Sequence, residues 1–123
     1  MAQSILPDCW YTLSVPENVC LSKPGIYCWV IDGVDSYIGK YSDGKRPTQH
    51  YGHIVARKLA DKTYRKSNPD GFRRVHLALC SAVQDERKIV LRILENVEPT
   101  RLQERETELM RPTLNGPAAR NSD

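Results

Sequence analysis

Two tyrosine-bearing triplets on either side of a turn constrain the fold of this chain more than any other feature. Gly25-Ile26-Tyr27 and Tyr37-Ile38-Gly39 flank residues 32–35, whose sequence Asp-Gly-Val-Asp is typical of a turn. The β-branched and aromatic run that ends at Ile31 predicts a first strand, and residues 36–41 predict the return strand. The resulting β-hairpin would hold two phenols and two glycines in a small area, which indicates a site rather than packing alone.

The size and composition of the chain favour one globular domain. It has 123 residues, of which 40% are hydrophobic and 27% charged. No apolar run approaches the ~20 residues of a membrane-spanning helix, and the first residues lack the pattern of a secretory signal, so we expect a cytoplasmic protein without membrane contact. We expect residues 1–22 to form an extended arm over the core, 23–116 to form the domain, and 117–123 to form a disordered tail.

The cysteines and the charges add two expectations. The four cysteines lack the Cys-x-x-Cys spacing of a zinc site and are too few for a disulfide scaffold, so we expect free thiols. The formal net charge is only +3, but between residues 40 and 74 ten basic residues stand against three acidic ones. Such a segment is either an ordinary solvated surface or a face that contacts phosphates.

A first helix is predicted after the turn at 42–45, with Pro47 in its first turn. Its apolar side carries Tyr51, Val55 and Leu59 at a 3.6-residue period. The opposite side carries a basic stripe. The stripe consists of Arg46, His50, His53 and Arg57.

The remaining elements complete the expected architecture. Residues 62–71 break the first helix, a second amphipathic helix follows over about 72–83, and residues 88–97 form a mostly apolar third strand. The pattern predicts an α/β fold of the α+β kind. We expect a small three-stranded, mainly antiparallel sheet flanked by about three helices.

The third of these helices contains a carboxylate in an unusual place. Thr100 and Gln103 have the spacing of a capping box, which would open a helix that runs to about Met110. Glu106 then falls on the apolar side with Leu109, where a carboxylate costs energy unless a cation or a metal ion lies beside it. The alternative is a carboxylate at the edge of the apolar side that reaches solvent or pairs with an arginine.

The inventory of polar residues suits phosphodiester hydrolysis. That reaction needs a cation to neutralise the phosphate, a group that activates water, and a carboxylate-held divalent ion near the leaving oxygen. The two triplets, followed in order by an arginine, a glutamate and an asparagine, resemble the GIY-YIG nuclease superfamily. The resemblance extends from Pro24 to Asn115.

The resemblance implies roles for the hairpin and for the first helix. Tyr27 and Tyr37 correspond to the paired tyrosines, one of which acts as a general base or holds the attacking water. A phenol is protonated at neutral pH, so the base role needs a nearby cation, for which Lys40 is the candidate. Arg46 corresponds to the arginine that clamps the scissile phosphate, with Arg57 as the second choice.

Three further residues complete the implied site. His50 occupies a position where many members have another tyrosine; it either assists proton transfer or is an ordinary surface histidine. Glu106 corresponds to the metal-binding carboxylate, with Mg²⁺ or Mn²⁺ as the ion. Asn115 corresponds to a closing asparagine that orients by hydrogen bonding, although the segment between Glu106 and Asn115 is short for the family. We expect Glu106, Arg46 and the two tyrosines to surround one pocket.

The resemblance therefore implies a metal-dependent endonuclease that hydrolyses DNA, with RNA not excluded. The alternatives are a non-catalytic nucleic-acid-binding module of the same fold, or a nuclease subunit active only in a larger complex; the partners to expect are DNA and either a second copy of the chain or a larger complex. The long basic stretch after the second strand is either a DNA-contacting elaboration or a lysine-rich connecting loop. The candidates for nucleic-acid contact are Arg57, Lys58, Lys62, Arg65, Lys66, Arg73 and Arg74.

Overall fold

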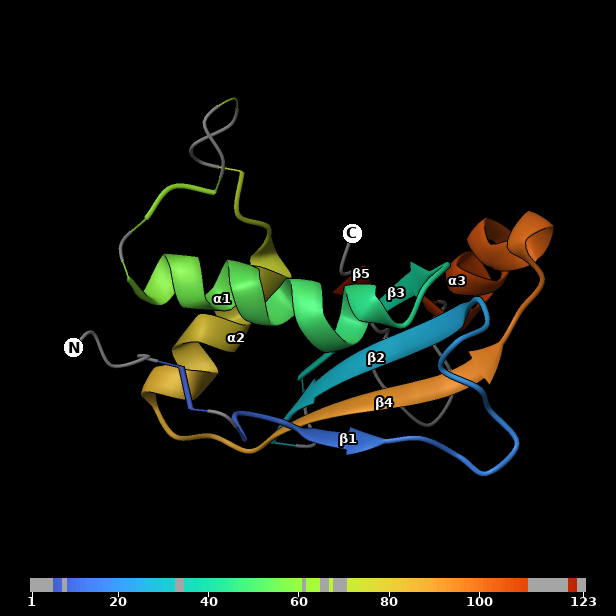
Figure 1. Cartoon of the computed structure of the whole chain (residues 1–123), viewed down its shortest axis with the longest axis horizontal. Helices are drawn as coiled ribbons and strands as arrows, with labels where there is room; N and C mark the ends of the chain where they lie inside the picture. The colour runs from blue at the N-terminus through green and yellow to red at the C-terminus, as the bar shows by residue number, and fades with distance from the viewer. Residues whose placement is uncertain are drawn as a thin grey trace.

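A five-stranded sheet in the order β1-β4-β2-β3-β5 forms the centre of the computed structural model (Figure 1). The structure describes residues 6–7, 9–32, 35–60, 62–64, 67, 71–110 and 120–121. The strands are β1 (Thr12–Ser14), β2 (Gly25–Ile31), β3 (Asp35–Tyr41), β4 (Ile89–Asn96) and β5 (Arg120–Asn121).

The predicted hairpin is present. β2 and β3 are antiparallel, and the register sets Tyr27 opposite Gly39 and Tyr37 opposite Trp29. β4 pairs antiparallel with the other edge of β2. The three-stranded antiparallel sheet that the sequence predicted is therefore confirmed as the centre of a larger one.

Two short edge strands correct the expected number of strands. β1 runs parallel to β4, and β5 runs parallel to β3. They were missed because strands of three and two residues are too short to show an alternating pattern. Trp10 stacks on Trp29 with ring centroids 5.2 Å apart, so part of the N-terminal segment packs against the core.

A C-terminal strand of two residues lies at the edge of the sheet beside β3. Arg120–Asn121 falls in the segment that we expected to be disordered, but its backbone pairs with β3. β3 would otherwise present a row of unpaired backbone groups at the edge of the sheet, and pairing satisfies part of that row.

The three expected helices are α1 (Tyr51–Leu59), α2 (Arg74–Gln84) and α3 (Leu102–Met110). A π-helical segment, Arg46–His50, leads directly into α1, and a 3₁₀ turn, Pro99–Arg101, leads into α3. The predicted capping box at Thr100 is wrong. The chain is already helical from Pro99, a residue that suits a first helical position, and the N-cap Glu98 makes no side-chain capping hydrogen bond.

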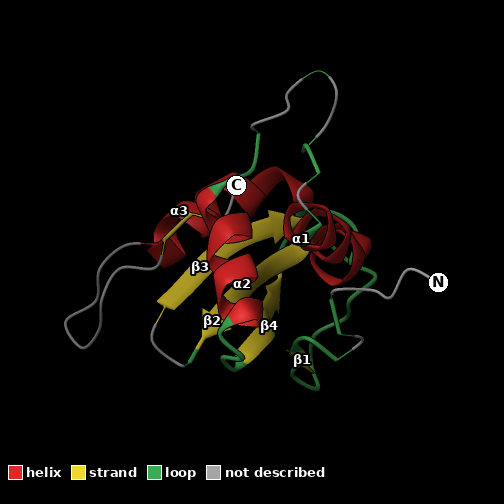
Figure 2. Cartoon of the chain, turned by 90° about the vertical axis from the view of Figure 1, so that its left-hand side faces the viewer, coloured by secondary structure: helices red, strands yellow, loops and turns green. Residues whose placement is uncertain are grey.

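The helices divide between the two faces of the sheet. Because side chains alternate along a strand, Tyr27, Trp29 and Tyr37 share one face, which α1 and α2 cover; we call it the tyrosine face. Ile26 and Cys28 share the other face, which α3 covers; we call it the α3 face. Figures 1 and 2 show α1 and α2 packed together and α3 beside β3.

Gly25, the first residue of the motif, is needed for a close approach of backbones. A Cβ atom there would lie 2.3 Å from the carbonyl oxygen of Glu95 and 2.9 Å from the Tyr41 hydroxyl. The pairing of β2 with β4 is also irregular between Ile26 and Tyr27. Gly25 therefore permits the close approach of β2 to β4.

One expectation from composition is met in the same description. Cys9, Cys20, Cys28 and Cys80 are all free thiols, the first two exposed and the last two buried. Among the described residues, no helix has the length and apolar character to cross a membrane.

Candidate active site

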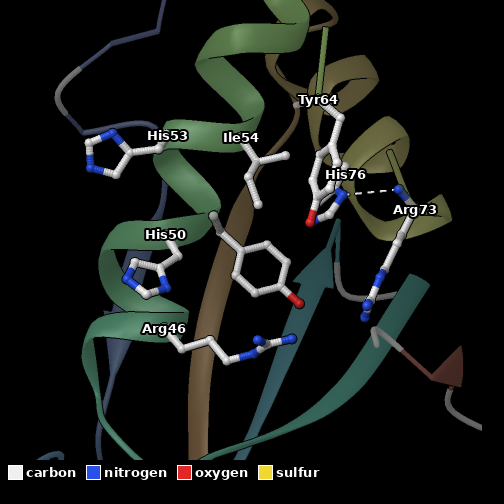
Figure 3. Close-up of a pocket in the computed structure, with 8 residues that line it drawn as sticks. Arg46, His50, His53, Ile54, Tyr64, Arg73 and His76 are labelled. Carbon is white, nitrogen blue, oxygen red and sulfur yellow. Dashed lines mark hydrogen bonds between the residues drawn. The ribbon is translucent and has the colours of Figure 1, made fainter. Parts of the chain in front are cut away.

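Three residues of the basic stripe, Arg46, His50 and His53, lie in one wall of an open hollow of about 350 Å³ between α1 and α2 (Figure 3). We call it the α1–α2 hollow. Its first wall consists of Arg46, His50, Tyr51, His53 and Ile54. Its second wall consists of Tyr64, Arg73 and His76.

Tyr51 is a residue of this hollow that sequence reasoning assigned only to the core. We expected an α-helical period from Pro47, which places His50 one turn after Arg46. The first turn is instead π-helical, and its wider turn brings Tyr51 closer to the side of Arg46 than an α-helical turn would. A 3.6-residue period places Tyr51 on the apolar side of the helix, so the sequence did not predict that Tyr51 lines the hollow.

Tyr51 connects the hollow to the tyrosine of the first triplet. The hydroxyl oxygens of Tyr27 and Tyr51 are 2.6 Å apart in a buried hydrogen bond that either phenol can donate. Tyr27 itself is fully buried in the core. Its hydroxyl therefore meets the hollow through Tyr51. Tyr37 is also buried and packs in the core of the tyrosine face.

Arg46 and Arg73 join this hollow to a second one. Both also line a hollow of about 370 Å³ at the end of β3, which we call the β3–α3 hollow. Figure 3 shows their guanidinium groups reaching the same end of the α1–α2 hollow, although they come from different segments. The remaining residues of the β3–α3 hollow are Lys40, Tyr41, Ser42 and Leu102.

His76 supports this arrangement as a neutral ring. Its Nδ1 atom accepts a hydrogen bond of 3.0 Å from the backbone N–H of Arg73. Burial, together with the charges of Arg73 and Arg46, lowers the pKa of His76 from 6.5 to about 4. The ring is therefore uncharged at neutral pH, and its proton is on Nε2.

Glu106 is buried beside a cation, as its place on the helix predicted. Its Oε1 atom lies 3.6 Å from Nζ of Lys40, and the exposed fractions of the two side chains are 1% and 33%. The alternative of a solvent-facing carboxylate is therefore wrong. Lys40 follows Ile38 by two residues in β3, which places the ion pair on the α3 face.

This placement corrects the expectation of one common pocket. Tyr27 and Tyr37 lie on the tyrosine face, whereas Glu106 lies on the α3 face, with the sheet between them. The two faces meet at the end of β3, because Lys40, the partner of Glu106, lines the same hollow as Arg46. The sequence could not reveal this division, since it does not show which face of a sheet a helix covers.

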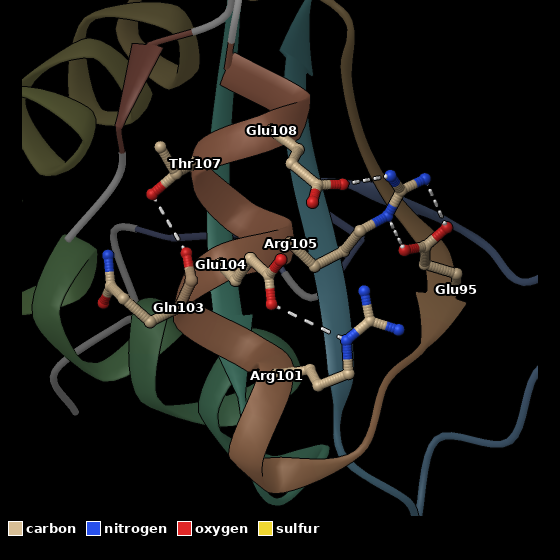
Figure 4. A network of polar contacts seen from close by, with 7 residues as sticks. All are labelled: Glu95, Arg101, Gln103, Glu104, Arg105, Thr107 and Glu108. Atoms are coloured by element: carbon tan, nitrogen blue, oxygen red, sulfur yellow. Dashed lines mark hydrogen bonds and ion pairs between the residues drawn. The ribbon is translucent and has the colours of Figure 1, made fainter.

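An ion network on the outer side of α3 holds the helix that carries Glu106 (Figure 4). Arg105 pairs with Glu95 of β4 and, at 2.9 Å from Nη1 to Oε2, with Glu108. Arg101 lies 3.7 Å from Glu104, one turn away. The link from Arg105 to Glu95 ties α3 to the sheet, and so fixes the position of Glu106.

The other predicted cations have less central positions. The Nε of Arg57 donates a 2.8 Å hydrogen bond to the carbonyl of Thr63, away from the α1–α2 hollow that Arg46 lines. The ammonium of Lys58 lies 5.5 Å from the centre of the Phe72 ring. Lys62 and Arg74 are exposed, whereas Arg65, Lys66 and Asn115 lie outside the described residues.

Glu106 is the residue that could hold a metal ion. No group of three or more histidine, cysteine, aspartate or glutamate side chains in the described part of the chain could bind one. A single carboxylate nevertheless fits Mg²⁺, which commonly takes one or two carboxylates together with water and substrate phosphate. The burial and charge of Glu106 suit this role, provided that the half-buried Lys40 turns aside.

The chemistry of the site is inferred from the residues of this chain alone. Comparisons with protein-family models, curated proteins and solved structures matched nothing to this chain. Of the residues predicted from the sequence, Lys40, Arg46, His50 and Arg73 line the two adjoining hollows. Glu106 joins them through Lys40, and Tyr27 joins them through Tyr51.

Proposed function

We propose that this protein is a metal-dependent endonuclease of the GIY-YIG type that hydrolyses DNA phosphodiester bonds. One observation carries the proposal: Arg46 and Lys40 line one hollow, and Lys40 is ion-paired with the buried Glu106. A guanidinium, an ammonium and a carboxylate from three separate elements thus come together at the end of β3. Burying a carboxylate is costly, and binding nucleic acid alone does not require it.

Arg46 is the residue that holds the phosphate in this proposal. Its guanidinium can donate two parallel hydrogen bonds to phosphate oxygens, a geometry that an ammonium lacks. It lines both hollows, so a phosphate that spans them lies within its reach. Lys40 adds a second positive charge on the side of Glu106.

The phenol that meets the attacking water is Tyr51 rather than Tyr27. Tyr51 lines the hollow, and its bond to Tyr27 fixes the direction of its hydroxyl. His50, on the same wall, takes part in proton transfer. The water attacks phosphorus, the bond from phosphorus to the leaving oxygen breaks, and a proton passes to that oxygen.

Glu106 is the proposed ligand for Mg²⁺ or Mn²⁺. When bound, the ion would neutralise charge that develops on the leaving oxygen. In its absence Lys40 balances the carboxylate.

A plasmid-nicking assay with Mg²⁺, Mn²⁺ and EDTA arms tests the proposal. We expect nicking with either ion, none in EDTA, and large losses in Glu106→Ala and Arg46→Ala. Arg92→Ala, an exposed position on β4, is the control for removing a positive charge. An intact plasmid with every divalent ion, or undiminished cutting by the two site variants, would refute it.

A non-catalytic nucleic-acid-binding module is the second candidate. The closed pair of Glu106 and Lys40 favours it, because a carboxylate that stays neutralised by lysine holds no metal. Gel-shift binding of DNA that persists in Glu106→Ala, from a wild-type protein that never cuts, is the expected result for this candidate.

A further inference from the structure

The α1–α2 hollow contains a set of residues that the proposed chemistry does not use. Tyr64, Ile54 and the ring of His76 add apolar and aromatic surface to its walls. Its volume of about 350 Å³ is within the range of small-molecule sites. A site that only clamps a phosphate has no need of such walls.

The Tyr64 ring is held in place from two sides. It stacks on His76, with centroids 6.0 Å apart and planes at 27°, and it meets Phe72 edge to face at 5.5 Å. The preceding residue, Thr63, accepts the hydrogen bond from Arg57. The aromatic wall is therefore formed without a ligand, and the ring remains partly exposed.

The two ends of the hollow differ in chemistry. The guanidinium groups of Arg46 and Arg73 occupy one end, and the rings of Tyr64 and His76 and the side chain of Ile54 lie at the other (Figure 3). His76 adds an N–H donor without adding charge, because Nδ1 already accepts from the Arg73 backbone. A ligand that matches both ends is an anion joined to a flat, polar, aromatic ring.

We propose that the α1–α2 hollow binds the base of the nucleotide whose phosphate Arg46 and Arg73 hold. Aromatic side chains stack on bases that are free of a duplex, and basic residues beside them contact the backbone. A base inside a duplex cannot enter a pocket unless it leaves the stack. The substrate is therefore DNA with an unstacked nucleotide, at a single strand, a branch or a lesion, and this inference rests on the proposed nuclease function.

Binding in EDTA tests this proposal independently of cleavage. NMR titrations of the intact chain would compare thymidine 5′-monophosphate, 2-deoxyribose 5-phosphate and inorganic phosphate. We expect the nucleotide to bind about tenfold more tightly than the sugar phosphate, the size of effect typical of one stacked base. Equal affinities of the nucleotide and the sugar phosphate would overturn the proposal.

Variants of the two ends separate stacking from charge. Tyr64→Ala should abolish the difference between nucleotide and sugar phosphate and leave the affinity for sugar phosphate unchanged, whereas Tyr64→Phe should retain it. Arg73→Ala should weaken both ligands, and Arg92→Ala, a charge control on β4, should weaken neither. If Tyr64→Ala keeps the difference in affinity between the nucleotide and the sugar phosphate, or weakens the binding of both ligands equally, the base pocket is refuted.

The failure of this proposal and that of the proposed function are distinguishable. Cleavage of plasmid without any preference for the nucleotide would leave the nuclease intact and remove the base pocket. Preferential binding of the nucleotide without any cleavage would support the base pocket and refute the nuclease function.

Discussion

The two faces of the sheet place their polar groups in opposite surroundings. On the tyrosine face, the hydroxyls of Tyr27 and Tyr51 bond to each other at the wall of an open hollow. On the α3 face, Glu106 is closed beneath a helix, with Lys40 as its countercharge. The tyrosine face, which we also call the open face, can admit a substrate. The α3 face, which we also call the closed face, buries a charge that needs a countercharge.

The difference shows how a site can be divided by a sheet and still act as one. Alternation along β3 sends Tyr37 and Tyr41 to one face and Lys40 to the other. At the end of the strand both faces open on the same hollow, which Lys40, Tyr41 and Arg46 line. Substitutions on one face or the other should therefore have different effects.

The largest effect is expected from the closed face. Glu106→Gln preserves the shape of the side chain and removes its charge, so cleavage should fall by at least about 100-fold. Single-turnover rates with Mg²⁺ measure this, with circular dichroism to confirm that the variant folds. Glu98→Gln, at an exposed residue just before the turn that leads into α3, is the matched control. A Glu106→Gln rate within a few-fold of wild type would remove the catalytic role of the closed face.

On the open face, Arg46→Ala should lower the cleavage rate by about 100-fold, as expected for the loss of a donor to charge that develops in the transition state. Arg57→Ala is the discriminating control, because the Arg57 guanidinium bonds to the carbonyl of Thr63. The same single-turnover assay compares the two variants. If Arg57→Ala proves the more damaging, the assignment of the phosphate to Arg46 is wrong.

A pH effect should reveal the buried imidazole of the open face. The pKa of His76 is lowered to about 4 in the folded protein, so its contribution to stability is complete above the unfolded value of 6.5 and is lost as pH falls toward 4. The free energy of unfolding should drop by about 2 kcal/mol between pH 7 and pH 5 from this group.

Urea denaturation at several pH values measures this drop. His76→Gln should remove it, and His53→Gln, at an exposed position of α1, should retain it. Parallel pH profiles for wild type and His76→Gln would show that the ring is not held neutral in the fold.

The smallest effect concerns the pair of phenols. Tyr27→Phe should lower the free energy of unfolding by about 1 kcal/mol, since one buried hydrogen bond is lost. Tyr51→Phe should lower the cleavage rate more than Tyr27→Phe does, because Tyr51 lines the hollow. If Tyr27→Phe lowers the cleavage rate more than Tyr51→Phe does, Tyr27 is the phenol that takes part in catalysis.

Much of the fold could be predicted from continuous stretches of sequence. The hairpin from Gly25 to Tyr41 is marked by β-branched residues and a turn, β4 by an apolar run, and the helices by a 3.6-residue period of apolar residues. β1 and β5 lack such signals, since a strand of two or three residues is specified by its partner strand and not by its own sequence.

The site was predictable in its residues but not in its arrangement. The apolar side of α3 correctly predicted that Glu106 is buried beside a cation. The turn at Arg46–His50 is π-helical and departs from the assumed 3.6-residue period, so Tyr51 was not predicted to line the hollow. Neither Tyr64 nor His76 carries a motif, and the chain brings them to the hollow only through tertiary packing.

The central claim is that Arg46 on the open face and Glu106 on the closed face act on one phosphate. Single-turnover cleavage of plasmid DNA by wild type, Arg46→Ala, Glu106→Gln and the double variant tests it most directly. Groups that act together in one transition state show non-additive losses, so the double variant should be about as slow as the slower single variant. Losses that multiply in the double variant, or a wild-type protein that cuts with no divalent ion, would contradict the claim.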